Sequence, residues 1–266
     1  MDLELKGKVA IVTGGSKGIG KAVAKELAHE GVSVALVARD KATLDAAATE
    51  IAKETGAKAK GFTADTGDDA SVKAMVAAVH KEFGRVDILV NGAAQPGGQA
   101  KPPTLAEITN EAFWADMNVK VMGYLRTCRE VAPIMAKQGG GRIINISGLA
   151  ARNTGSTIGS IRNISVQALT KNLADELAPQ GIQAICVHPS LTRTEKTPGV
   201  IERQSKAQNL SAAEVEKKMA SKNLVGKLIT SEDIAYLCVF LASPKAISVN
   251  GDAIAAGGGW PGVIYY

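Results

Sequence analysis

The stretch Thr13-Gly14-Gly15-Ser16-Lys17-Gly18-Ile19-Gly20 decides the fold of this chain. It follows a short apolar run, KVAIVT at residues 8–13, and opens a segment whose apolar residues recur at helical spacing. Glycines permit a tight turn and a close approach of the backbone to a ligand. The first turn of the helix adds unpaired N–H groups and a partial positive charge. The pattern therefore predicts a strand, a turn and a helix that hold the diphosphate of a dinucleotide, rather than an ordinary strand-to-helix turn.

The rest of the chain repeats this alternation of strand and helix. Apolar runs suited to strands lie at residues 32–37, 58–63, 86–91, 142–147, 182–188 and 252–256. Helical patterns lie at residues 41–54, 68–83, 110–137 (with a break near Asp116), 158–177 and 231–241. Continuous apolar strands between amphipathic helices predict an α/β, Rossmann-type, doubly wound parallel sheet of about seven strands with helices on both faces. No linker-like segment divides residues 1–266, so we expect a single domain.

Composition and charge exclude several classes of protein. Of the 266 residues, 45% are hydrophobic and 21% charged, which is typical of a globular protein with a large core. The net charge of +5 comes from basic residues spread along the chain, so we expect no nucleic-acid partner. No apolar run approaches the roughly 20 residues that span a bilayer, and residues 1–6 lack the pattern of a signal peptide. Cys128, Cys186 and Cys238 match no metal spacing, so we expect buried thiols, no metal site and a cytoplasmic location.

The glycine turn and several later segments resemble the short-chain dehydrogenase/reductase family over nearly the whole chain. The TGxxxGxG form is typical of that family, and further matches follow in order at Asp65-Thr66, Asn91-Gly92-Ala93-Ala94, Pro189 to Thr194 (with Ser190 in place of a glycine) and Gly251 to Gly259. The resemblance implies that the coenzyme site contains Gly14, Ser16, Lys17, Gly18, Ile19, Gly20, Arg39, Asp65, Thr66, Asn91, Gly92, Ala93, Pro189 and Thr194. It also implies that Asp65 contacts the adenine.

Charge at the end of the second strand predicts which coenzyme is bound. An NAD-specific domain usually has an acidic residue there that accepts hydrogen bonds from the ribose. This chain has Ala38 followed by Arg39, and Lys17 lies in the glycine turn. A guanidinium can hold a 2′-phosphate through charge-assisted hydrogen bonds. We therefore predict NADP(H) rather than NAD(H); the alternative is that both cations are solvated surface charges.

The catalytic end departs from the family pattern. The resemblance predicts a serine, a tyrosine acid/base about a dozen residues later, and a lysine four residues after the tyrosine. Alignment on residues 168–174 puts Gly159 at the tyrosine position and Asn163 at the lysine position. No tyrosine lies between Tyr124 and Tyr236, so we expect an atypical member without the Tyr-x-x-x-Lys pair.

The serine and the supporting asparagine of the family are also displaced. The family's serine position aligns with Gly148. Ser147 can therefore take the role of that serine only if its loop shifts it inward. The asparagine falls at Lys120, whereas Asn118 is two residues early and would face another side of the helix. Lysine and asparagine are thus exchanged, and we hypothesise that Lys120 and Asn163 meet beside the nicotinamide ribose. The alternative is that both positions drifted after activity was lost.

Without the tyrosine, another group must protonate the alkoxide that hydride transfer creates. A desolvated lysine near other cations can have a lowered pKa, so we predict that Lys120 is the acid/base and that Ser147 orients the substrate oxygen. Further candidates are Thr157, Ser160, Arg162 and His188. Arg162 either binds a substrate carboxylate or is an exposed helix arginine. His188 is either a proton donor or a satisfied histidine at a strand end.

Two classes of function remain open. One is an NADP(H)-dependent oxidoreductase for a carbonyl or alcohol substrate, and the other is an NADP(H)-binding protein without redox turnover, such as a regulatory subunit, a scaffold or a dehydratase.

The resemblance implies a substrate lid at about residues 190–220, whose basic residues favour a polar or anionic small molecule. The loop at 95–103 is expected at the same edge of the sheet as this lid, because ligands bind outside the carboxyl ends of the strands. The resemblance and the aromatic tail at 259–266 favour a homo-tetramer or homo-dimer.

Overall fold

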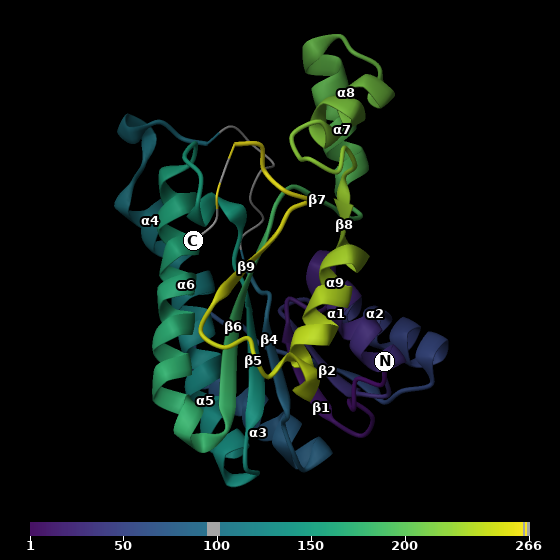
Figure 1. The fold of residues 1–266 in the computed structure, drawn as a ribbon, viewed down its shortest axis with the longest axis vertical. Coiled ribbons are helices and arrows are strands. Elements are labelled where there is room, and N and C mark those ends of the chain that lie inside the picture. The colour runs from purple at the N-terminus through teal and green to yellow at the C-terminus, as the bar shows by residue number, and fades with distance from the viewer. Residues whose placement is uncertain (95–101, 263, 265–266) are drawn as a thin grey trace.

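The computed structural model describes residues 1–94, 102–262 and 264, and a seven-stranded parallel sheet forms its centre (Figure 1). Its strand order is β3-β2-β1-β4-β5-β6-β9. The strands are β1 (Val9–Thr13), β2 (Ser33–Ala38), β3 (Ala59–Thr63), β4 (Ile88–Asn91), β5 (Gly141–Ile146), β6 (Ile182–Pro189) and β9 (Ala253–Ala256). The predicted α/β fold with seven parallel strands is therefore confirmed.

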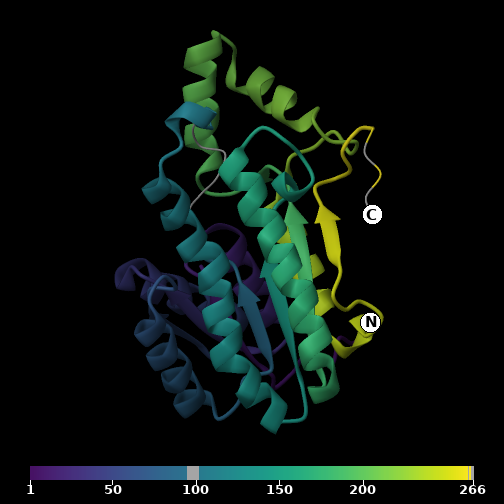
Figure 2. The same cartoon turned by 90° about the vertical axis from the view of Figure 1, so that its left-hand side faces the viewer.

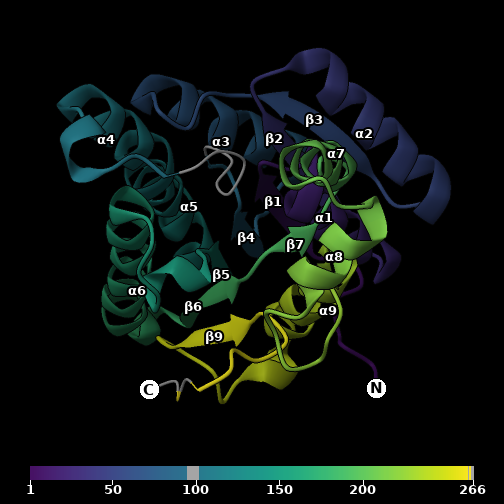
Figure 3. The same ribbon diagram turned by 90° about the horizontal axis from the view of Figure 1, so that it is seen from above.

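Helices cover both faces of this sheet, as Figure 3 shows from above. One face packs against α1 (Gly18–His29), α2 (Lys41–Thr55) and α9 (Ser231–Ala242). The other packs against α3 (Asp69–Phe83), α5 (Gly123–Lys137) and α6 (Thr157–Leu177). Successive strand residues point to opposite faces, so the two cores take alternate residues of the same strands.

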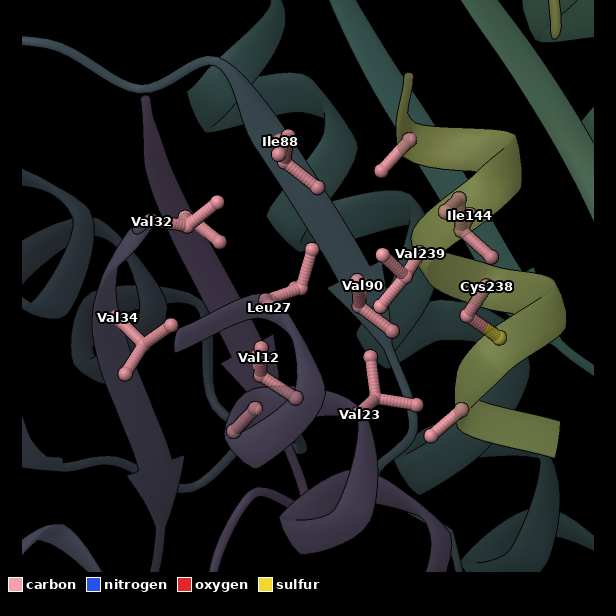
Figure 4. Packing of buried hydrophobic residues seen from close by; sticks show 14 of the residues in the cluster. Val12, Val23, Leu27, Val32, Val34, Ile88, Val90, Ile144, Cys238 and Val239 are labelled. Atoms are coloured by element: carbon pink, nitrogen blue, oxygen red, sulfur yellow. The ribbon is translucent and has the colours of Figure 1, made fainter. Parts of the chain in front are cut away.

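The first of these cores shows why the strands are apolar throughout. Val23 and Leu27 of α1 pack onto Val12 and Val90 of the strands, and α9 covers Ile144 (Figure 4). Because both faces are covered, no strand position in the middle of the sheet can remain polar without a buried partner. The three cysteines of the chain are free and buried, as expected.

The helix expected at 110–137 is interrupted close to Asp116, as the sequence suggested, but the interruption has an unexpected form. It forms α4 (Asn110–Met117), a π-helical turn (Asn118–Met122) and α5. The predicted break near Asp116 therefore lies within two residues of the observed one, although the chain widens into a π turn there instead of ending. This turn sets the direction of Lys120.

Beyond β6 the chain forms a small extension above the carboxyl ends of the strands (Figure 1 and Figure 2). It contains α7 (Thr197–Gln208) and α8 (Ala212–Ala220), between two short paired strands, β7 (Thr192–Arg193) and β8 (Ile229–Thr230). We call residues 192–230 the α7–α8 segment. Of the loop expected at 95–103, residues 95–101 lie outside the described residues, as do 263, 265 and 266 of the tail.

Among the described helices, none combines the length and the apolar character that a bilayer crossing requires.

Candidate active site

The carboxyl ends of the central strands meet at one edge of the sheet. The strand order reverses between β1 and β4, whose ends Thr13 and Asn91 are register partners. Ligands of open α/β sheets bind in the crevice outside such a reversal. The site is therefore expected above β1, β4, β5 and β6.

The glycine turn is packed too closely for side chains. Gly14 has φ +71°, and a Cβ built on it would lie 2.8 Å from the carbonyl oxygen of Gly92. A Cβ on Gly20 would lie 2.3 Å from the carbonyl oxygen of Gly14. The Thr13 hydroxyl oxygen also accepts hydrogen bonds from the amides of Gly92 (3.1 Å) and Ala93 (3.3 Å). The two predicted coenzyme segments are thus joined by the Thr13 hydroxyl and by the close approach of their backbones at Gly14 and Gly92.

The start of α1 accepts an anion in this structure. The Gly18 amide donates to Glu195 Oε2 at 3.1 Å. The carboxylate stands in for a negatively charged ligand, so the turn fits the diphosphate of a dinucleotide. Ser16 and Ile19 are half-buried beside it.

Two exposed cations flank the end of β2, which fits a 2′-phosphate. Arg39 and Lys17 are both exposed. Hydrogen bonds from Thr43, and to a smaller extent the charge of Lys17, lower the pKa of the neighbouring Asp40 carboxyl. Lys17 therefore lies in the electrostatic vicinity of the residue that follows Arg39.

The other residues predicted to bind the coenzyme make local contacts within the protein. Asp65 is exposed, and its Oδ1 accepts from the Gly67 amide at 2.9 Å. Thr66 is buried, and its hydroxyl donates to the Val119 carbonyl at 3.3 Å, which ties it to the π turn. Pro189 ends β6. The Thr194 methyl lies 3.5 Å from the place of a Cβ on Gly18.

Asn91 is engaged inside the sheet. Its Nδ2 donates to Asn145 Oδ1 at 2.9 Å, and its Oδ1 accepts from the Thr127 hydroxyl at 2.7 Å. Asn145 Nδ2 in turn donates to Thr170 Oγ1 at 2.9 Å. All four side chains are buried, so this chain of bonds joins β4, β5, α5 and α6 at the edge of the site.

The structure brings Lys120, Asn163 and Ser147 together. Lys120 Nζ donates to Asn163 Oδ1 at 2.9 Å and to the Ser147 carbonyl at 3.0 Å. The Ser147 hydroxyl donates to the Asn163 carbonyl at 2.8 Å. Asn118 faces elsewhere, since its Nδ2 donates to the Gly67 carbonyl at 3.0 Å. The three residues come from the π turn, α6 and the end of β5.

Burial makes Lys120 an unusual amine. Only 4% of it is exposed, and desolvation lowers its pKa from 10.5 to about 7, with a further lowering by the charge of Arg162. An ammonium has three N–H donors, and the Asn163 and Ser147 bonds use two. The group is therefore able to gain or lose a proton near neutral pH.

Arg162 is not the exposed helix arginine that was one of its two interpretations. It is buried, and its Nη1 donates to both carboxylate oxygens of Asp116, at 2.6 and 2.8 Å. The charge of Arg162 is thus balanced by a carboxylate on α4. The sequence offers no local signal for this pair, because the two residues are 46 positions apart.

His188 matches the interpretation of a satisfied histidine. Its Nδ1 accepts from the Gly148 amide at 3.3 Å, so Nε2 carries the proton toward Gln167 Oε1, 3.0 Å away. Burial lowers the pKa of His188 to about 4, with smaller effects of Arg152 and Lys120. Of the other candidates, Ser160 donates to the Asn153 carbonyl at 2.9 Å and Thr157 begins α6.

Gly159 and Gly148, where the sequence comparison expected the family's tyrosine and serine, have different amounts of free space around them. A Cβ on Gly159 would lie 2.7 Å from the hydroxyl oxygen of Ser156, which caps the start of α6. A Cβ on Gly148 would lie 3.3 Å from Asn163 Nδ2. A larger residue at 159 would therefore have to move the cap.

Within the described part of the chain, no group of three or more His, Cys, Asp or Glu side chains is arranged to hold a metal ion.

Comparisons with known proteins identify the family. The model of the family described as short chain dehydrogenase matches residues 8–232. The short-chain reductase protein NovJ of Streptomyces niveus is 34% identical over 255 residues, which cover 95% of this chain and 94% of that protein. This chain belongs to the short chain dehydrogenase family.

Solved structures agree with the fold. L-Sorbose reductase from Gluconobacter frateurii, complexed with NADPH and L-sorbose, matches with a TM-score of 0.93 and 29% identity, over 99% of this chain and 100% of that one. Actinorhodin polyketide ketoreductase with NADPH matches with a TM-score of 0.87 and 30% identity, over 96% and 98% of the two chains. The likeness therefore extends over the whole domain.

Proposed function

We propose that this protein is an NADP(H)-dependent oxidoreductase that interconverts a carbonyl compound and an alcohol, with Lys120 in place of the missing tyrosine. The observation that carries the proposal is the buried Lys120 amine, held 2.9 Å from Asn163 Oδ1 at the carboxyl edge of the sheet. Two solved relatives, at 29% and 30% identity, contain NADPH. The glycine turn, Arg39 and Lys17 supply the matching coenzyme contacts in this chain.

The coenzyme supplies or accepts a hydride when it is bound. Reduction of a carbonyl leaves a negative charge on the substrate oxygen, which a positioned acid must neutralise. In the proposed mechanism Lys120 Nζ holds that proton, while Asn163 Oδ1 and the Ser147 carbonyl fix the amine. The Ser147 hydroxyl, which donates to the Asn163 carbonyl in this structure, turns in the proposed mechanism and donates its one proton to the substrate oxygen, which it thereby orients. In the oxidative direction the neutral amine takes the proton back.

Replacing Lys120 with methionine tests the proposal. We expect reduction of an active carbonyl substrate to fall roughly 100- to 10,000-fold in kcat, the usual range for a general acid. NADPH binding, followed by fluorescence, should persist. Lys171→Met is the matched control, because Lys171 is an exposed lysine on α6 paired with Asp175. Unchanged turnover in Lys120→Met would remove the lysine from the mechanism.

A second function is favoured by one observation: no tyrosine lies between Tyr124 and Tyr236, which fits the expectation that the family's tyrosine position falls on Gly159. The protein would then bind NADP(H) without redox turnover. A panel of ketones, aldehydes and ketoses, including L-sorbose, decides between the two. Tight NADPH binding with no consumption of NADPH on any member of the panel would favour the second function.

A further inference from the structure

The anion at the start of α1 comes from a distant part of the chain. The Gly18 amide and Glu195 Oε2 are 3.1 Å apart, although their residues are separated by 177 positions. The first turn of α1 contains no acidic residue, and the side chain of Lys17, the residue before the helix, makes no capping bond. Glu195 of the α7–α8 segment therefore supplies the negative charge that this helix start attracts.

Local structure holds Glu195 in this place. The Thr194 amide donates to Thr197 Oγ1 at 2.9 Å, and the Thr197 amide donates to the Thr194 carbonyl at 3.0 Å. Thr197 is buried and begins α7, which lies over the start of α1 in Figure 3. The turn at 194–197 thus directs the carboxylate toward the glycine turn. The contact joins the α7–α8 segment to the coenzyme site.

A diphosphate at the same helix start requires the same N–H group. Both ligands are anions, so they repel each other and cannot share one donor. We propose that Glu195 is an intramolecular competitor of the coenzyme diphosphate for the Gly18 amide, so that coenzyme binding releases the α7–α8 segment. This inference rests on the proposed function, because it assumes that a dinucleotide occupies the turn.

The coupling has to act in both directions. If the coenzyme displaces Glu195, then holding Glu195 on Gly18 weakens the coenzyme by the same factor. Removing the charge of Glu195 should therefore strengthen coenzyme binding and loosen the segment. A residue that only stabilised the fold would loosen the segment without any gain in affinity.

Glu195→Gln tests the proposal, with Glu202→Gln as the matched control. Glu202 is an exposed carboxylate on α7 that pairs with Lys206, so its variant makes the same charge change without touching the turn. We expect the Kd for NADPH to fall about two- to fivefold in Glu195→Gln, as for a charge at a helix terminus, and to stay unchanged in Glu202→Gln. Hydrogen exchange of residues 194–208 in the coenzyme-free protein should become faster only in Glu195→Gln.

Inorganic pyrophosphate separates this proposal from the proposed function. It should speed exchange of residues 194–208 in the wild type and have no such effect in Glu195→Gln. If no variant binds NADPH, the proposed function fails, and the pyrophosphate experiment still decides the role of Glu195. An unchanged or weaker NADPH affinity in Glu195→Gln, or no response of the wild-type segment to pyrophosphate, overturns the proposal.

Discussion

The β1–α1 end and the β5–α6 end of the candidate site differ in how far their charged groups are exposed to solvent. At the β1–α1 end, the proposed coenzyme contacts are backbone amides and two exposed side chains, Arg39 and Lys17. At the β5–α6 end, the proposed catalytic contacts involve the buried side chains of Lys120 and Arg162, and Arg162 pairs with the half-buried Asp116. Exposed charges are screened by water and cost little to place, whereas buried charges shift their pKa or need a partner. We therefore expect mutations at the β1–α1 end to change coenzyme affinity, and mutations at the β5–α6 end to change stability and its pH dependence.

The largest expected effect is on stability, through Lys120. Its folded pKa is about 7 against 10.5 for the free side chain. Between these values the unfolded chain binds more protons, so the stability of the wild type rises with pH from about 7 to 10. The gain should reach roughly 4 kcal/mol and be absent in Lys120→Met. Urea unfolding at several pH values measures it. A pH-independent difference between Lys171→Met and Lys120→Met would contradict the buried-amine interpretation.

His188 should give a similar but smaller effect in acid. Burial lowers its pKa from 6.5 to about 4, so the unfolded chain binds more protons between these values. Stability is complete above pH 6.5 and is lost as the pH falls toward 4, by roughly 3 kcal/mol. His188→Gln should flatten this slope in thermal melts, with His29→Gln, an exposed histidine, as the control. Equal acid sensitivity in both variants would argue against the role of His188.

The smallest effect on folding should come from Arg39. Because it is exposed, Arg39→Ala should leave the melting temperature unchanged. Loss of a charge-assisted hydrogen bond to a 2′-phosphate should raise the Kd for NADPH about 10- to 100-fold, with little change for NADH. Lys41→Ala, which removes a neighbouring exposed cation paired with Asp45, is the control. Parallel losses for NADPH and NADH would show that Arg39 does not select the coenzyme.

Local patterns predicted the elements that a few neighbouring residues can specify. The glycine spacing and the apolar runs predicted β1, α1 and the remaining strands of the sheet to within about two residues of their ends. The α7–α8 segment was expected only as a polar lid, because its helices pack on a small core of their own that includes Ile201, Val215 and Met219. The break in the long helix was located to within two residues, but its form was not predicted, because a π turn leaves no strong mark in the pattern of apolar residues.

The sequence by itself determined that a parallel sheet carries a dinucleotide turn, because this feature depends on residue type and short spacing. Only the tertiary structure decided which long-range contacts form at the two ends of the site: Lys120 with Asn163, Arg162 with Asp116, and Glu195 with Gly18. These contacts join residues 43, 46 and 177 positions apart. Such pairs depend on which helix faces and loops converge, and packing of the whole domain sets that convergence.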